Sequence, residues 1–202
     1  LQLMVDINKT PISDINTWVI GNWKMNGRLV RNENFLAQLL PKTENLTMDK
    51  SFFCGLAVPS LYLFQFSNRL IDSNLFLGTQ DISSENQDGA FTGDISANMC
   101  NEFDCSFTII GHSERRIKYL ESDINLVKKA KVSIEHNILP VICVGESKKD
   151  REEGNAVNTV RLQIQNFTLG LSTEELSSCI FAYEPLWAIG SGENAKPSDA
   201  EA

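Results

Sequence analysis

Three side chains of different chemistry each follow a short apolar run of the sequence. They are a cation, Lys24, an imidazole, His112, and a carboxylate, Glu184. A carboxylate can remove a proton from carbon, a neutral imidazole can donate an N–H to a carbonyl oxygen, and an ammonium group can stabilise developing negative charge. At a single site these groups suit proton abstraction beside a carbonyl and reprotonation at the neighbouring carbon.

The local sequence around two of these residues fits that chemistry. His112 lies in Gly-His-Ser-Glu-Arg-Arg, where a strand is expected to turn into a helix, and the positive helix end favours an uncharged imidazole. Glu184 ends the dry stretch Phe181–Tyr183, where loss of water strengthens a carboxylate as a base. The segment Pro185–Gly192 begins with a rigid proline and holds two glycines, which is typical of a lid that closes over a site.

Each of the three residues also has a purely structural explanation. Lys24 could extend to the rim of the fold with its ammonium group in water. His112 could only cap a helix, and Glu184 could be a buried carboxylate paired with an arginine. Each structural explanation is reasonable for one residue alone. A base, an electrophile and a cation at three strand ends are less easily explained by chance, so the combination favours catalysis.

The elements that would position these residues are βα units, in which a buried parallel strand is followed by a crossover helix. Short apolar runs begin between 23 and 40 residues apart, the spacing that such units need. The runs are Trp18–Ile20, Phe52–Val58, Leu75–Leu77, Phe107–Ile110, Leu139–Val144 and Cys179–Ala182.

Single polar residues stand at the carboxyl ends of most of these runs, and they favour a barrel over an open sheet. In a barrel the ends surround one mouth, whereas an open sheet spreads them along an edge. No glycine-rich phosphate loop of the nucleotide-binding type follows any run. We therefore expect one α/β domain. The strand-end polar residues are Asn22, Lys24, Gln80, His112, Glu146 and Glu184.

The boundaries of three helices can be predicted from residue types. Asn32 is expected to cap a helix that Pro41 stops. Ser122 is expected to begin a helix that ends at Asn137, a residue that tolerates the left-handed conformation. Ser172 and Glu175 have the spacing of a capping box.

Composition excludes several classes of partner and site. The 202 residues carry a net charge of −8, which argues against nucleic acid and anionic membranes. No apolar run approaches the ~20 residues needed to span a bilayer, and no signal peptide begins the chain, so a soluble protein of the cytoplasm is expected. Five cysteines without a C-x-x-C pair and two histidines favour reduced thiols over disulfides or a zinc site.

At these same residues the sequence resembles the triosephosphate isomerase family. The matching stretches follow the family's order and spacing over nearly the whole chain, and the resemblance implies a (β/α)8 TIM barrel. They are GNWKMNG at 21–27, GTQDISSENQDGAFTGDIS at 78–96, IGHSERR at 110–116, PVICVGE at 140–146 and AYEPLWAIGSG at 182–192.

The resemblance assigns a role to each site residue. It implies that Glu184 moves the proton between two carbons of a triose phosphate in glycolysis and gluconeogenesis, with His112 as the neutral electrophile. It implies that Asn22 and Lys24 bind substrate, and that Glu114 holds Lys24. A glutamate base that acts together with a neutral histidine is the known acid–base arrangement of this family.

The resemblance further implies a phosphate contact, a homodimer and a reaction without any metal or organic cofactor. Gly190 resembles the lid residue whose amide binds the substrate phosphate. Thr92, with Asp94 nearby, resembles the loop residue that enters a partner subunit. Nucleic acid and membranes are not among the implied partners.

The sequence also departs from the family pattern. Residues 1–17 form a longer leading extension than the family shows, and residues 18–202 hold six βα units, without a seventh and eighth. We expect these 202 residues alone to be inactive and poorly folded, because such barrels need ~250 residues. Milder departures are Leu186 and Ser191 in the lid and Asp81 and Asp94 in the loop after the third strand.

Two other functions stay open at this point. A different aldose–ketose isomerase could use the same proton transfer on a longer sugar phosphate, although Trp187 and the lid motif weigh against it. A non-catalytic binding or interaction protein could retain the fold, although it would have no chemical need for Asn22, Lys24, His112 and Glu184 together.

Overall fold

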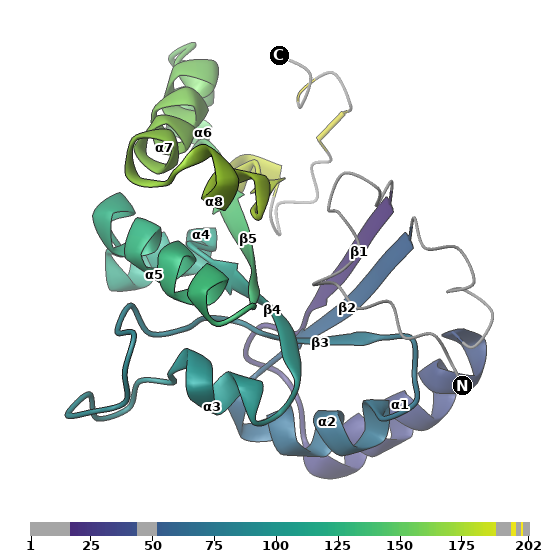
Figure 1. Ribbon diagram of the computed structural model, residues 1–202. Helices are drawn as coiled ribbons and strands as arrows, with labels where there is room; N and C mark the ends of the chain where they lie inside the picture. Colours follow the sequence, from purple (N-terminus) through teal and green to yellow (C-terminus); the bar gives the residue numbers. More distant parts are fainter. Residues whose placement is uncertain (1–16, 44–51, 189–194, 197–198, 200–202) are drawn as a thin grey trace.

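The structure is a computed structural model that describes residues 17–43, 52–188, 195–196 and 199. In that part of the chain six parallel strands pair in chain order, β1-β2-β3-β4-β5-β6. Figure 1 shows the sheet curling as it proceeds, with helices outside it, so the fold is a partial TIM barrel as the sequence predicts. The strands are β1 (Thr17–Asn22), β2 (Phe52–Val58), β3 (Phe76–Thr79), β4 (Cys105–Ile110), β5 (Leu139–Val144) and β6 (Ile180–Tyr183).

Helices connect the strands as the βα spacing requires. None of those within the described ranges is both long and apolar enough to cross a bilayer. The α-helices are α1 (Leu29–Thr43), α2 (Leu63–Leu70), α3 (Ala97–Asn101), α4 (Ser113–Tyr119), α5 (Asp123–Glu135), α6 (Lys148–Glu152), α7 (Ala156–Gly170) and α8 (Thr173–Ser177), and the 3-10 turns are η2 (Ser60–Tyr62) and η3 (Leu186–Ala188).

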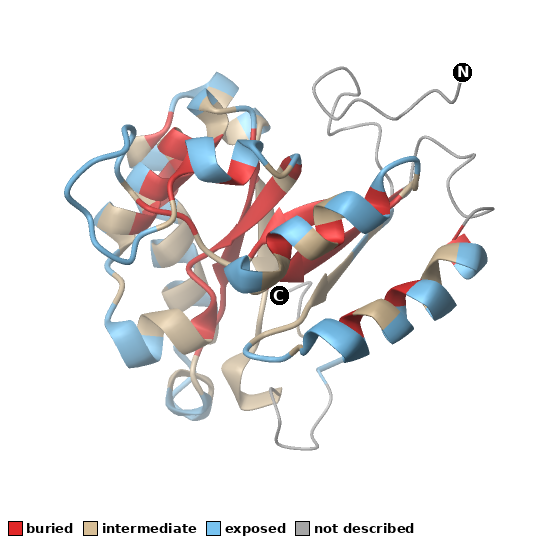
Figure 2. Cartoon of the chain, turned by 90° about the horizontal axis from the view of Figure 1, so that it is seen from below, coloured by how far each residue is buried: buried red, intermediate tan, exposed pale blue. Residues whose placement is uncertain are grey.

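Both faces of the central strands are buried, because successive side chains of a strand point to opposite sides of the sheet. On the inner face, Phe53, Phe107 and Val141 belong to one apolar cluster. On the outer face, Leu56 packs with side chains of α1, α2 and α3, and Ile142 packs with those of α5 and α7. Figure 2 shows this burial concentrated on the strands and on the helix sides that face them.

Phe107 fills the inner face only because two glycines leave it room. A Cβ at Gly55 or Gly78 would lie closer than 3.0 Å to the Phe107 ring. Phe53 also packs edge-on against Phe107, with ring centroids 5.7 Å apart. The inner layer thus pairs one large ring with two missing side chains on neighbouring strands, as dense packing requires.

The predicted boundaries are confirmed for two of the three helices. The Ser122 hydroxyl accepts the Asn125 N–H at 3.4 Å, and Asn137 has φ 58°. Ser172 and Glu175 form the predicted capping box, with each side chain accepting the other's backbone N–H.

The prediction for α1 is wrong at both ends. The helix begins at Leu29, and Asn32 lies buried in its first turn, where its carboxamide accepts the Arg28 N–H at 3.0 Å. Pro41 lies inside the helix, which continues to Thr43. Proline removes one hydrogen bond, and so close to the helix end this loss does not stop the remaining turn.

The residue that ends α4 is in an unfavourable backbone conformation. Leu120 has φ 55° and is 82% exposed. The left-handed region costs a residue with a Cβ about 1–2 kcal/mol, whereas glycine enters it freely. We expect Leu120→Gly to raise the free energy of unfolding by about 0.5–1 kcal/mol, after the greater chain entropy of glycine is subtracted. Urea denaturation of the full-length protein measures this change.

Leu120→Ala is the control for that prediction, since it removes the exposed side chain and keeps the Cβ. It should give no gain in stability. An equal gain from both variants would show that the side chain, and not the backbone conformation, is the source of the cost.

Candidate active site

The carboxyl ends of β1, β4 and β6 bring the predicted catalytic residues to the same end of the sheet. Parallel pairing in chain order aligns these ends, so residues far apart in the sequence become neighbours. The His112 Nε2 atom lies 3.3 Å from the Glu184 Oε1 atom, and the Lys24 Nζ atom lies 3.1 Å from the Glu114 Oε1 atom. Glu114 is two residues from His112, so both contacts meet at the start of α4.

His112 is held by the turn that joins β4 to α4. It is the N-cap residue of the helix and is only 6% exposed. Its Nδ1 atom accepts the backbone N–H of Glu114 at 3.2 Å, and a ring nitrogen that accepts carries no proton. The single proton of the neutral ring is then on Nε2, which faces the Glu184 carboxylate.

Glu184 is held at its backbone and has only long contacts at its carboxylate. Its N–H donates to the Val144 carbonyl at 2.7 Å, which continues the pairing of β6 with β5. A Cβ at Gly145 would overlap the Glu184 carbonyl oxygen, so glycine is required there. The carboxylate accepts the Ser113 N–H at 3.4 Å, and its side chain is 23% exposed.

Cys143, a buried residue of the inner cluster on β5, is influenced by the charge of Glu184. Burial, and then the charge of the Glu184 carboxylate, raise the pKa of the Cys143 thiol above its usual value. The thiol therefore keeps its proton beside the carboxylate. A buried cysteine in an apolar strand gives no sign of this influence in the sequence.

Asn22 is the last residue of β1, and Lys24 lies in the loop that follows it. Lys24 has φ 50°, in the left-handed region that side chains rarely adopt. Its N–H donates to the Asn22 Oδ1 atom at 2.9 Å, which links the two residues through the turn. The ion pair of Lys24 with Glu114 is partly exposed, so its value is in orientation more than in stability.

Glu146, noted in the sequence only as a strand-end polar residue, holds the start of the predicted lid. It is fully buried, and its Oε1 atom accepts from Tyr183 Oη at 3.0 Å, Trp187 Nε1 at 2.8 Å and Arg151 at 3.2 Å. Burial, followed by the hydrogen bond to Glu146, raises the pKa of Tyr183 to about 12. The backbone carbonyl of Glu146 also accepts the Leu186 N–H at 3.0 Å. The only sign of this role in the sequence was that an acidic residue, Glu146, closely follows the apolar run Leu139–Val144.

Two of the predicted interface residues lie away from this site. The loop between β3 and α3 extends outward from the sheet in Figure 1 and carries Thr92 and Asp94, both exposed. Asp94 accepts a hydrogen bond from the Ser83 hydroxyl at 2.6 Å. Gly190, the predicted phosphate-binding residue, lies outside the described residues.

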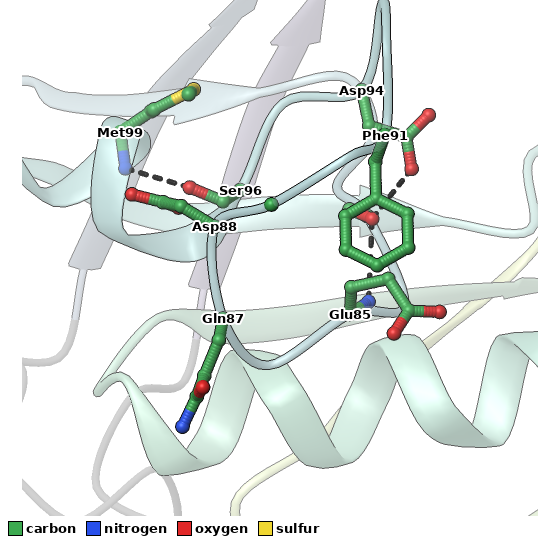
Figure 3. Close-up of a pocket in the computed structure, with 9 residues that line it drawn as sticks. Glu85, Gln87, Asp88, Phe91, Asp94, Ser96 and Met99 are labelled. Atoms are coloured by element: carbon green, nitrogen blue, oxygen red, sulfur yellow. Dashed lines mark hydrogen bonds between the residues drawn. The ribbon is translucent and has the colours of Figure 1, made fainter.

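A hollow in this same loop is too small for a substrate. Its volume is about 40 Å³, room for about one water molecule, whereas small-molecule sites occupy roughly 300–1,000 Å³. Figure 3 shows the Phe91 ring and the Glu85, Asp88 and Asp94 side chains around it. Within the described ranges, no group of three or more His, Cys, Asp or Glu side chains could hold a metal ion.

The protonation pattern of the two histidines should be opposite, and this can be measured. Nitrogen-15 NMR of the full-length protein at neutral pH should show His112 protonated at Nε2 and bare at Nδ1, because Nδ1 accepts the Glu114 N–H. His136 is the internal control: its Nδ1 lies 2.9 Å from the Val132 carbonyl oxygen and must carry a proton to bond there. A doubly protonated His112 would contradict this hydrogen-bond geometry. The signals that disappear in His112→Gln are those of His112.

Comparison with known proteins agrees with this geometry. The family model described as triosephosphate isomerase matches residues 17–202. Proteins named triosephosphate isomerase from Bordetella pertussis and Ralstonia nicotianae are each 40% identical to this chain, and one from Mycoplasma capricolum is 39% identical. Each alignment covers 91% of this chain and 71–72% of the relative. The chain belongs to the triosephosphate isomerase family and is an isomerase of that family.

Proposed function

We propose that the protein interconverts dihydroxyacetone phosphate and D-glyceraldehyde 3-phosphate through an enediolate. The observation that supports this most directly is the 3.3 Å contact between His112 Nε2 and Glu184 Oε1. It pairs an uncharged N–H donor with a carboxylate at the strand ends where the Lys24 cation also lies. Proton transfer beside a carbonyl needs these three groups.

The proposed reaction begins with Glu184 as the base. Its carboxylate takes a proton from the carbon beside the substrate carbonyl, and the C–H electron pair becomes the new carbon–carbon π bond. The carbonyl π electrons move to oxygen, where the His112 Nε2–H donates a hydrogen bond to the developing charge. The hydroxyl proton of the first carbon must next reach the former carbonyl oxygen, and His112 Nε2 can relay it by giving its own proton to that oxygen and taking the hydroxyl proton in return. The protonated Glu184 then returns its proton to the neighbouring carbon while the new carbonyl forms on the first carbon, which completes the isomerisation without an external acid or base.

The contacts of Glu184 leave it free to take part in this reaction. Its two polar contacts at the carboxylate, with His112 and Ser113, are 3.3 and 3.4 Å long. A substrate oxygen would replace the carboxylate as the acceptor of the His112 N–H. The carboxylate would then lie beside carbon with little hydrogen bonding to lose.

The other site residues bind and orient the anionic substrate in this proposal. Lys24, held by Glu114, attracts the substrate and stabilises the enediolate, and Asn22 contacts the same oxygens. Gly190 would supply a backbone N–H to the phosphate. In this proposal these residues carry out the steps without a metal or organic cofactor. The reaction belongs to glycolysis and gluconeogenesis in the cytoplasm.

Shortening the proposed base tests the function. Glu184→Asp keeps the charge and withdraws the carboxylate by about 1 Å, a displacement that can cost roughly 100-fold in rate. A coupled assay of the full-length protein with triose phosphate, in EDTA, should show full wild-type activity and kcat lower by about 100-fold in the variant. Glu135→Asp, an exposed residue of α5, is the matched control and should retain full activity.

Each other outcome of that assay points to a different function. Activity only on longer sugar phosphates would indicate another aldose–ketose isomerase. Loss of activity in EDTA would contradict a metal-independent reaction, and near-normal turnover of Glu184→Asp would remove Glu184 as the base. Absence of isomerase activity in the full-length wild type would favour an interaction protein.

We also propose that the protein acts as a homodimer through the loop that carries Thr92 and Asp94. Apolar side chains exposed on this loop and on the first two βα turns support a contact surface there. Met25 is 96% exposed, Leu61 86% and Phe91 44%. Burial of such side chains is the usual source of association free energy.

Sedimentation of the full-length protein tests the dimer. Wild type should sediment as a dimer, and Thr92→Arg should give monomer at micromolar concentration, because a long cation cannot be packed into a close contact. Thr173→Arg, at an exposed position of α8, is the matched control and should remain dimeric. A monomeric wild type would reject the proposed assembly.

A further inference from the structure

Gln80, the first residue after β3, makes an unusual set of contacts. Its Nε2 atom lies within hydrogen-bond distance of three oxygens: Asn22 Oδ1 at 3.1 Å, the Lys24 carbonyl at 2.9 Å and the Ala57 carbonyl at 3.2 Å. The carboxamide NH2 has two hydrogens, so both are used and one is shared. One side chain thus bridges β1, β2 and β3 at their carboxyl ends.

Two of these three oxygens belong to the substrate-binding residues of the proposed function. Lys24 has φ 50°, which a side chain rarely adopts unless its surroundings hold it there. The Lys24 N–H is held by Asn22, and the Lys24 carbonyl is held by Gln80. The Asn22 carboxamide is itself fixed by Gln80, so both holds on the Lys24 backbone depend on the same side chain.

The backbone next to Gln80 is held to the helices that follow β4. The adjacent Asp81 carboxylate binds Lys129 of α5 at 2.7 Å and Arg115 of α4 at 2.8 Å. Lys129 is 4% exposed and also binds Glu121 at 2.7 Å, so this anchor is buried and paired. Arg115 is three residues from His112, which ties the position of Gln80 to the element that carries the electrophile.

We propose that Gln80 is a positioning residue that holds the Lys24 backbone in its left-handed conformation and orients the Asn22 carboxamide toward the substrate. This inference rests on the proposed function for its kinetic consequence. Only a side chain of this length with two N–H donors can serve the three oxygens. A glutamate would set a carboxylate against three acceptors, and a methionine would fill the same space without any donor.

The kinetic test is Gln80→Met in the full-length protein. Without the donor, Lys24 can relax toward a negative φ and carry its ammonium group away from the substrate, a shift of the size that costs 10- to 100-fold in kcat/KM. We expect KM to rise and kcat to fall, because Lys24 acts on the bound anion as well as on the enediolate. A variant that only folds less completely would lower the apparent kcat and leave KM unchanged.

Gln65→Met is the matched control. Gln65 of α2 is also half-buried, donates to the Leu29 carbonyl at 2.8 Å and accepts from Asn32 at 2.9 Å, but it makes no contact with Asn22 or Lys24. This variant removes a comparable side-chain brace, between helices α1 and α2, and KM should not change. An equal rise in KM in both variants would overturn the proposal.

A second measurement does not depend on activity. Proton–nitrogen NMR should show the Lys24 backbone amide and the Asn22 carboxamide displaced in Gln80→Met and Gln80→Glu, and undisturbed in Gln65→Met. If the wild type does not isomerise triose phosphates, the proposed function fails while these signals still decide the positioning role. Unchanged Lys24 and Asn22 signals in folded Gln80→Met would reject it.

Discussion

Parallel pairing of neighbouring strands in chain order is the constraint on which the rest of the structure depends. It aligns the carboxyl ends of six strands, so Lys24 and Glu184, which are 160 positions apart in the sequence, reach the same end of the sheet. The backbone satisfies its own hydrogen bonds in the ladders, which leaves the side chains at the strand ends available for chemistry. The site is therefore a consequence of the topology, and the loops refine it.

The two glutamates after β5 and β6 show how environment separates structural from reactive carboxylates. Glu146 is fully buried, and three donors converge on its Oε1 atom. Glu184 is partly exposed, and its carboxylate has contacts of 3.3 and 3.4 Å. Moving Glu146 would break several short hydrogen bonds, whereas moving Glu184 costs little. The first residue can therefore hold a lid, and the second can approach and leave a substrate.

The parts of the fold that were predictable have a local cause in the sequence. Apolar runs locate the six strands, because the strands of a parallel sheet covered by helices are rich in apolar residues, and the central strands are buried on both faces. Ser122, Ser172 and Glu175 were interpreted correctly, since capping involves residues only three apart. Asn32 was misassigned because its carboxamide is buried inside the first turn of α1, where it also donates to Gln65, 33 positions away. Local residue types cannot reveal such a partner.

The same distinction holds for the candidate site. The residue types proposed for catalysis and their strand-end positions were visible, because the proposed chemistry restricts them. The influence of Glu184 on Cys143 and the hydrogen bond from Gln80 to the Lys24 carbonyl were not, because each joins residues that belong to or follow different strands. The positive φ of Lys24 also has no local signal, since lysine does not favour that conformation.

The packing of Phe107 against Gly55 and Gly78 restricts how the barrel interior can change over evolutionary time. Either glycine can be enlarged only after the aromatic ring has become smaller, because a Cβ at either position would collide with it. The reverse order passes through an overfilled interior that forces β2 and β3 away from β4. Which residue is allowed at one of these three positions thus depends on the other two, and so does the order in which they change. Related sequences should therefore differ at all three positions together.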